Sequence, residues 1–409
     1  MPRWPQVVLM VGALVASGGA AVSAGLQDFA AIERGRYLAN AADCGSCHTV
    51  PGSGQRFAGG RPIETPFGVL VAPNITPDRE TGIGAWSDEE FDAALRQGLR
   101  RDGKRLYPAM PYPYFTRMSR QDTKDIRAYL STIAPVHNTV AANKLPFPLN
   151  IRTGMFAWDR LYFSPGEFRA NPDKSIEWNR GAYLVQGPGH CGACHTPKTL
   201  FGGDKASASL QGYTLQGWVA PDITSGEGPL ASWPADDLAQ YLKTGHNRFA
   251  AAAGLMGEVV DFSTSKLSDA DVKAMATYLK DIKGPKAAMD SSSDQKVLTA
   301  GGAIYQDLCS ACHKSDGTGV PNLIPDLSHA ATVESGDPTT VLRVILQGAQ
   351  SVATDREPTG PAMPAFGWQL NDVQVAAVAS YVRNHWGKAT KVGEELVRKE
   401  RAALHARTN

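Results

Sequence analysis

All six cysteines of this 409-residue chain lie in three Cys-x-x-Cys pairs, and a histidine directly follows each pair. Such a small number excludes a fold held together by many disulfides. Zinc-binding pairs usually lie about 15–20 residues apart, whereas more than 100 residues separate these pairs from one another. The three motifs are Cys44-Gly45-Ser46-Cys47-His48, Cys191-Gly192-Ala193-Cys194-His195 and Cys309-Ser310-Ala311-Cys312-His313.

This spacing is that of covalent c-type haem attachment. Two thiols three residues apart on a helical turn can reach both vinyl groups of one macrocycle, and the next side chain can bind the iron from below. The sequence therefore predicts three haem c groups. Their thioether bonds would come from Cys44, Cys47, Cys191, Cys194, Cys309 and Cys312, and their proximal ligands would be His48, His195 and His313. A zinc or disulfide scaffold without haem is the alternative binding module.

The residues around the motifs repeat as well. A short helical segment precedes each motif, a proline-containing loop follows it, and an amphipathic stretch then ends at a glycine. A final helix is expected to begin at Ser119, Ser268 or Asn371, each with a capping partner three residues later. The loops contain Pro73-Asn74-Ile75-Thr76, Pro221-Asp222-Ile223-Thr224 and Pro325-Asp326-Leu327-Ser328. The repeats predict three mostly helical domains in tandem.

Three methionines are the candidates for the second axial ligand of each iron. Met110 and Met363 lie in matching Ala-Met-Pro segments ahead of the final helix, and Met256 lies at the corresponding place in the second repeat. Thioether sulfur is a soft donor that raises the reduction potential relative to a second imidazole. Packing in a hydrophobic core is the commoner role of methionine, and we assign that role to Met275, inside the last helix of the second repeat.

Charge and the N-terminus limit the class of protein. With 41 Lys or Arg against 40 Asp or Glu, the chain is nearly neutral and has no broad positive electrostatic field to attract a polyanion. Nucleic acid is therefore not expected as a partner.

The N-terminal segment has the pattern of a secretion signal. Arg3 precedes an apolar run from Val7 to Ala16, and small residues follow up to Ala24. This pattern predicts a secretory signal peptide over residues 1–24 and a periplasmic protein, either soluble or peripheral to the cytoplasmic membrane.

The order of these motifs resembles that of the tri-haem cytochrome c subunits of bacterial membrane-bound dehydrogenases that oxidise alcohols, gluconate, fructose or sorbitol. The resemblance is carried by the segments Ala72–Asp78, Tyr107–Pro113 and Gly187–Pro197 and spans nearly the whole mature chain. It implies a flavoprotein or quinoprotein catalytic subunit as electron donor and ubiquinone or a downstream cytochrome as acceptor. The loop from Gly317 to Leu323 resembles one in small cytochromes c whose proline carbonyl orients the proximal histidine, which implies this role for Pro321; a plain tight turn is the alternative.

The resulting expectation is an all-α protein with three cytochrome c-like domains and no substrate site of its own. The expected division is a signal peptide (1–24), domain 1 (25–144), an aromatic-rich linker (145–174), domain 2 (175–284), a flexible linker (285–294), domain 3 (295–388) and a basic C-terminal tail (389–409). The rival enzyme class is a multi-haem peroxidase with an open iron.

Two segments leave alternatives open. The first linker, with its many aromatic residues, would either pack across domains or form a docking surface for a partner. In the tail, Val392, Leu396, Ala403 and Leu404 fall near one helical face that Glu400 interrupts. This face would either contact a membrane surface or belong to a solvated charged helix.

Overall fold

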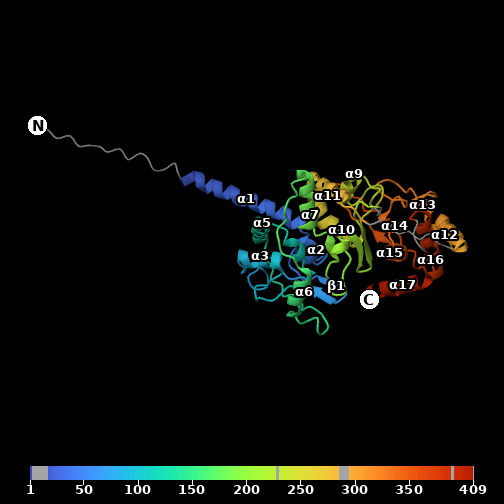
Figure 1. Cartoon of the computed structure of the whole chain (residues 1–409), viewed down its shortest axis with the longest axis horizontal. Coiled ribbons are helices and arrows are strands. Elements are labelled where there is room, and N and C mark those ends of the chain that lie inside the picture. Colours follow the sequence, from blue (N-terminus) through green and yellow to red (C-terminus); the bar gives the residue numbers. More distant parts are fainter. Residues whose placement is uncertain (2–16, 227–229, 285–293, 388–390, 409) are drawn as a thin grey trace.

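The computed structural model describes residues 1, 17–226, 230–284, 294–387 and 391–408. Most of the predicted signal peptide and of the predicted flexible linker lies outside these residues. The first helix, α1 (Ser17–Ala41), extends away from the body at its N-terminal end (Figure 1). No helix among the described residues is both long enough and apolar enough to cross a membrane.

The described chain is mostly helical, and each third begins with a helix that leads into the motif turn and contains a later helix that packs on the first. The small pair of strands precedes the middle helices in the first two thirds and follows them in the last third. The first third contains α1, α2 (Cys44–His48), β1 (Pro62–Thr65), β2 (Gly68–Val71), α3 (Asp88–Gln97), α4 (Tyr112–Phe115) and α5 (Arg120–Ser131). The second contains α7 (Ile176–Gln186), α8 (Gly192–His195), η1 (Ala206–Ala208), β3 (Gln211–Leu215), β4 (Trp218–Asp222), α9 (Ala235–Thr244), α10 (Gly254–Phe262), η2 (Thr264–Lys266) and α11 (Asp269–Asp281). The third contains α12 (Gln295–Leu308), α13 (Ser310–His313), α14 (Ala331–Glu334), α15 (Thr339–Gln347), β5 (Ala349–Gln350), β6 (Ala362–Met363), α16 (Asp372–His385) and α17 (Glu394–Thr408).

The final helices begin where the sequence predicts. Ser119 and Asn371 each form a complete capping box, and the Ser268 hydroxyl accepts from the Asp271 amide.

The all-α expectation missed three small antiparallel strand pairs, β1–β2, β3–β4 and β5–β6. In the second hairpin the turn residues Gln216 and Gly217 both have positive φ, as a two-residue hairpin turn requires.

In each third the first helix crosses the last: α1 packs on α5, α7 on α11 and α12 on α16. A glycine on the first helix allows the backbones to touch. A Cβ added at Gly35, Gly181 or Gly301 would lie 1.8, 1.9 or 2.1 Å from a carbonyl oxygen of the last helix. A methyl group there would therefore force the helices apart.

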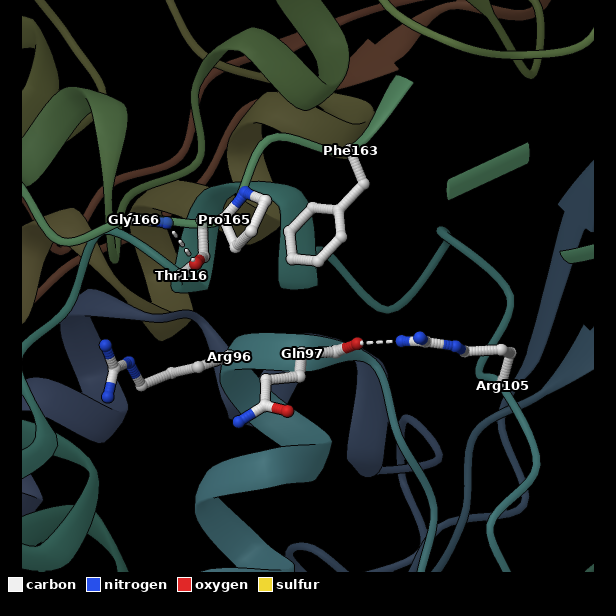
Figure 2. Close-up of a pocket in the computed structure, with 7 residues that line it drawn as sticks. All are labelled: Arg96, Gln97, Arg105, Thr116, Phe163, Pro165 and Gly166. Atoms are coloured by element: carbon white, nitrogen blue, oxygen red, sulfur yellow. Dashed lines mark hydrogen bonds between the residues drawn. The ribbon is translucent and has the colours of Figure 1, made fainter. Parts of the chain in front are cut away.

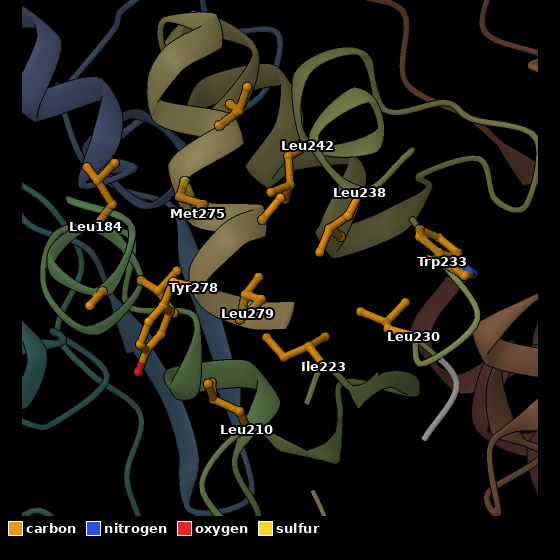
Figure 3. Close-up of a cluster of buried hydrophobic side chains, with 14 of the residues drawn as sticks. Leu184, Leu210, Ile223, Leu230, Trp233, Leu238, Leu242, Met275, Tyr278 and Leu279 are labelled. Carbon is orange, nitrogen blue, oxygen red and sulfur yellow. The ribbon is translucent and has the colours of Figure 1, made fainter. Parts of the chain in front are cut away.

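Each third has its own cluster of buried apolar side chains. In the second cluster, Leu184 on the first helix faces Met275, Tyr278 and Leu279 on the last (Figure 3). Met275 is 2% exposed, which confirms its assignment as a core residue. The thirds also contact one another: Tyr37 donates to Asp271 at 2.5 Å, and the Val219 amide donates to the Thr340 hydroxyl at 2.8 Å.

The two segments left open by the sequence now have defined environments. In the first linker, α6 (Gly154–Tyr162) buries Trp158 against the first third, while Phe147 and Phe156 stay exposed. The tail helix α17 packs on α15 and α16, and Val392 and Leu404 are buried in the third cluster. The apolar face of the tail therefore serves the fold of its own third.

Replacing Gly181 with alanine should lower the free energy of unfolding by about 1–3 kcal/mol, because the new methyl group overpacks the contact with Ala274. Gly154→Ala is the matched control, since an added Cβ there meets no atom within 4 Å. Denaturant unfolding of the haem-loaded protein measures both variants. Equal stability of the two would contradict the role assigned to the helix contact.

Candidate haem-attachment sites

Each Cys-x-x-Cys-His motif forms a single helical turn that follows the first helix of its third. These turns are α2, α8 and α13, and the first cysteine of the second and third motifs is the N-cap of its turn. No disulfide joins any of the six cysteines, so all six sulfur atoms are available for thioether bonds. Before attachment, burial raises the pKa of the Cys44 thiol to about 12 and that of the Cys309 thiol to about 11.

A proline carbonyl fixes the orientation of two of the predicted proximal histidines. His48 Nδ1 lies 2.7 Å from the Pro73 carbonyl oxygen, and His195 Nδ1 lies 2.8 Å from that of Pro221. A carbonyl can only accept, so Nδ1 carries the proton and Nε2 keeps its lone pair for a metal. Burial lowers the pKa of both rings, which favours the neutral form that can bind iron.

The third predicted proximal histidine lacks the hydrogen bond that the first two make. Pro325 occupies the position equivalent to Pro73 and Pro221. Burial lowers the pKa of the His313 ring, against the smaller raising effect of the Pro325 carbonyl. That carbonyl does not complete a hydrogen bond, and the buried Nδ1 has no partner among the described residues. The Pro325 carbonyl therefore lies near the His313 ring, and Pro321 is exposed; the orienting role of Pro321 stays a prediction.

The predicted methionine ligands lie in three different local structures. Met110 is in an irregular loop before α4, Met256 is inside helix α10, and Met363 is in strand β6. All three are partly buried. Each packs on the same apolar cluster as the first cysteine of its own third: Met110 with Cys44, Met256 with Cys191, and Met363 with Cys309.

These residues fit a covalently attached haem. Every third combines two cysteines on one helical turn without a disulfide, a partly buried imidazole, and a thioether beside the same apolar cluster. In the first two thirds the imidazole tautomer is also set for metal binding. The sequence predicted no role for Pro73 or Pro221 in orienting the histidines, although both lie in the repeated Pro-Asn/Asp-Ile-Thr segments.

The first and second sites are close neighbours. Helix α10, which carries Met256, contacts α2, and the Phe262 ring lies 2.8 Å from where a Cβ of Gly45 would be. Arg61 joins the two, because its guanidinium donates to the Ser46 carbonyl at 2.6 Å and to Glu258 at 2.8 Å. The α13 turn of the third site lies toward the far end of the body (Figure 1).

A cavity of about 380 Å³ lies outside these sites. Phe163 and Pro165 of the linker face Gln97 and Arg105 across it (Figure 2). The Arg105 guanidinium donates to the Gln97 carbonyl at 2.8 Å. None of the predicted haem residues lines this cavity, so it belongs to the contact between the linker and the first third.

The motifs, the helix pairs and the family match define a c-type cytochrome. Residues 32–134 and 298–386 match the family model described as "Cytochrome c". As a member of this class the chain carries covalently bound haem c and has an electron-transfer role.

Relatives extend the match to most of the chain. The gluconate 2-dehydrogenase cytochrome c subunit of Pantoea cypripedii is 39% identical over 88% of this chain and 87% of the relative. The quinone alcohol dehydrogenase cytochrome c subunit of Gluconobacter oxydans is 38% identical over 93% and 84%. A nicotinate dehydrogenase subunit of Pseudomonas putida is 41% identical over 87% of this chain, which matches 30% of that longer protein. The chain belongs to the family of cytochrome c subunits of bacterial dehydrogenases.

A buried carboxyl group lies beside the first site and was not predicted. Asp43 is 7% exposed, has positive φ, and accepts from the Ser46 hydroxyl at 2.7 Å, while its Oδ1 has no partner. Burial and the nearby Glu258 raise its pKa to about 8, against the opposing effects of Ser46 and Arg61.

Because the pKa of Asp43 in the folded state lies above its ordinary value of 3.8, the protonated carboxyl stabilises the fold at acid pH. That contribution should be lost as the pH rises toward 8. Asp43→Asn should therefore flatten the fall in unfolding free energy between pH 5 and pH 8, measured by denaturant unfolding. Asp307→Asn, at an exposed site on α12, is the control. An unchanged slope in Asp43→Asn would contradict the assignment.

Proposed function

We propose that this chain is a tri-haem electron-transfer subunit of a periplasmic dehydrogenase complex. It would accept electrons from a flavoprotein or quinoprotein catalytic subunit that oxidises an alcohol, sugar or sugar acid. It would pass them to ubiquinone or to a downstream cytochrome. The observation that carries the proposal is the threefold recurrence of a Cys-x-x-Cys-His turn with a methionine beside the same apolar cluster.

The residues of each site have distinct tasks in this proposal. The cysteine pairs hold the macrocycles, while His48, His195 and His313 bind one face of the irons and Met110, Met256 and Met363 the other. Haem c supplies the one-electron chemistry, and the chain supplies the environment. Apolar burial and thioether ligands favour the reduced iron, so the protein sets the potentials.

The surroundings of the sites support a relay. Site 1 and site 2 are joined by Arg61 and by the contact of α10 with α2. The second and third modules touch where the Trp233 indole donates to the His329 carbonyl at 2.9 Å. These contacts would keep the three cofactors within one body, which electron transfer between them requires.

The relatives and the N-terminus support the proposed partner and location. The relatives' names place them in gluconate, nicotinate and quinone alcohol dehydrogenases, which supports a catalytic dehydrogenase subunit as partner. Periplasmic location is supported by the predicted signal peptide over residues 1–24. The exposed linker residues Phe147 and Phe156 offer a place for the partner to dock.

Mass spectrometry of the protein, secreted from a host with haem c maturation, should report three haem masses above the mature polypeptide. Each of the double variants C44A/C47A, C191A/C194A and C309A/C312A should lose one haem mass, because covalent attachment needs those thiols. The bare polypeptide mass would contradict haem binding. The loss of more than one haem in a soluble double variant would contradict independent sites.

A functional assay tests the relay itself. The haem-loaded chain, co-purified with its dehydrogenase subunit, should be reduced on addition of the dehydrogenase substrate and reoxidised by a soluble ubiquinone analogue. The isolated chain should show low-spin ferric haem and no turnover of hydrogen peroxide. Peroxide turnover by the isolated chain would instead favour the peroxidase alternative.

A further inference from the structure

The linker contacts the Met110 loop on both sides of the methionine. On one side, the Tyr107 hydroxyl donates to the Leu149 carbonyl at 3.0 Å, and the Arg152 guanidinium donates to the Arg105 carbonyl at 2.8 Å. On the other side, the Tyr112 hydroxyl donates to Asp159 Oδ1 at 2.6 Å. Asp159 is in α6, so the linker helix reaches the loop two residues beyond Met110.

Asp159 joins the two ends of the loop. Its Oδ2 forms an ion pair with Arg105 Nε at 3.1 Å, while its Oδ1 accepts from Tyr112. Asp159 is 8% exposed and Tyr112 is completely buried. Burial removes the Tyr112 hydroxyl from water, and Asp159 replaces the hydrogen bond to water that is lost. The Tyr112–Asp159 pair therefore helps to hold the loop in position.

Aromatic packing fixes the direction of the Tyr112 side chain. Its ring meets Trp158 and Phe163 of the linker edge-on, with centroids 6.3 and 5.1 Å apart. On its other side the ring lies against Gly98, where an added Cβ would come within 2.7 Å of it. The hydroxyl is thereby directed to Asp159, and the backbone that leads from Tyr112 to Met110 has little freedom.

The other two predicted methionine ligands need no such support. Met256 is held by the hydrogen bonds of α10, and Met363 by the pairing of β6 with β5. Met110 lies outside any helix or strand. Within the loop, the Met110 amide donates to the Tyr107 carbonyl at 3.0 Å, and the Tyr112 amide to the Met110 carbonyl at 2.7 Å. Those two bonds tie Met110 to the same tyrosines that the linker holds.

We propose that Asp159 and Tyr112 are positioning residues that hold the Met110 sulfur on the iron of the first site. The linker helix thus sets the axial ligation and the reduction potential of one haem, in addition to joining two domains. This inference rests on the proposed function, because it takes Met110 as the ligand.

The test uses the haem-loaded full chain and the variants Tyr112→Phe and Asp159→Ala. Loss of the hydrogen bond should weaken the hold of the loop, so added imidazole should displace one methionine about tenfold more readily than in wild type. One of the three components in a redox titration should shift to lower potential. The sulfur-to-iron charge-transfer absorption of that haem should weaken in the ferric state.

Two further variants separate positioning from general stability. Asp159→Asn keeps an oxygen acceptor for Tyr112 and should restore most of the wild-type imidazole affinity and potential. Tyr183→Phe removes a hydroxyl bond of the same kind, to Asp122 at 2.7 Å, which joins α7 to α5 and does not join the linker to the Met110 loop, and it should leave all three components unchanged. Equal shifts in Tyr183→Phe and Tyr112→Phe would overturn the proposal.

Met110→Leu distinguishes the failure of this inference from failure of the proposed function. If Met110→Leu changes no haem component, Met110 is not a ligand, and the ligand assignment of the proposed function fails. If Met110→Leu abolishes the charge-transfer absorption of one haem while Tyr112→Phe and Asp159→Ala leave it intact, only the positioning role is overturned. The expected result is that all three variants affect the same component.

Discussion

The crossing of the first and last helix in each third is the contact on which the rest of the structure depends. Gly35, Gly181 and Gly301 let the two backbones touch, and this close approach brings together the apolar side chains of both helices. The motif turn follows the first helix directly. The position of each cysteine pair and of its histidine is therefore set by how closely its helix pair packs.

Local signals in the sequence predicted much of this architecture. The motifs, the caps at Ser119 and Asn371 and the core position of Met275 depend on residues that are neighbours in the chain, and the structure confirms the caps and the core position. The proline carbonyls that face the histidines come from residues about 25 positions away, a contact that no spacing rule specifies. In the third repeat, resemblance to a loop of small cytochromes assigned that role to Pro321, whereas Pro325 is the residue at the position of Pro73 and Pro221.

The three thirds also show that one repeat can position equivalent residues in different ways. Met110, Met256 and Met363 occupy matching places in the sequence, yet a loop, a helix and a strand carry them. Matching positions in the sequence could not predict this, because Met363 is placed by the pairing of β6 with β5 and the Met110 loop by contacts with the linker. The irregular loop of the first third packs on α6, a helix that has no counterpart between the second and third modules among the described residues.

The Arg61 bridge has a consequence for the independence of the modules. Its guanidinium joins the motif turn of one module to the helix that carries the predicted methionine ligand of the next. The Arg61 side chain therefore couples the position of α10 to that of α2. A cut between these two modules would remove the carboxylate partner of Arg61 and expose the apolar side chains at their contact. A cut before α12 would also separate bonded groups, since Thr214 donates to Asp337 and the Val219 amide donates to the Thr340 hydroxyl.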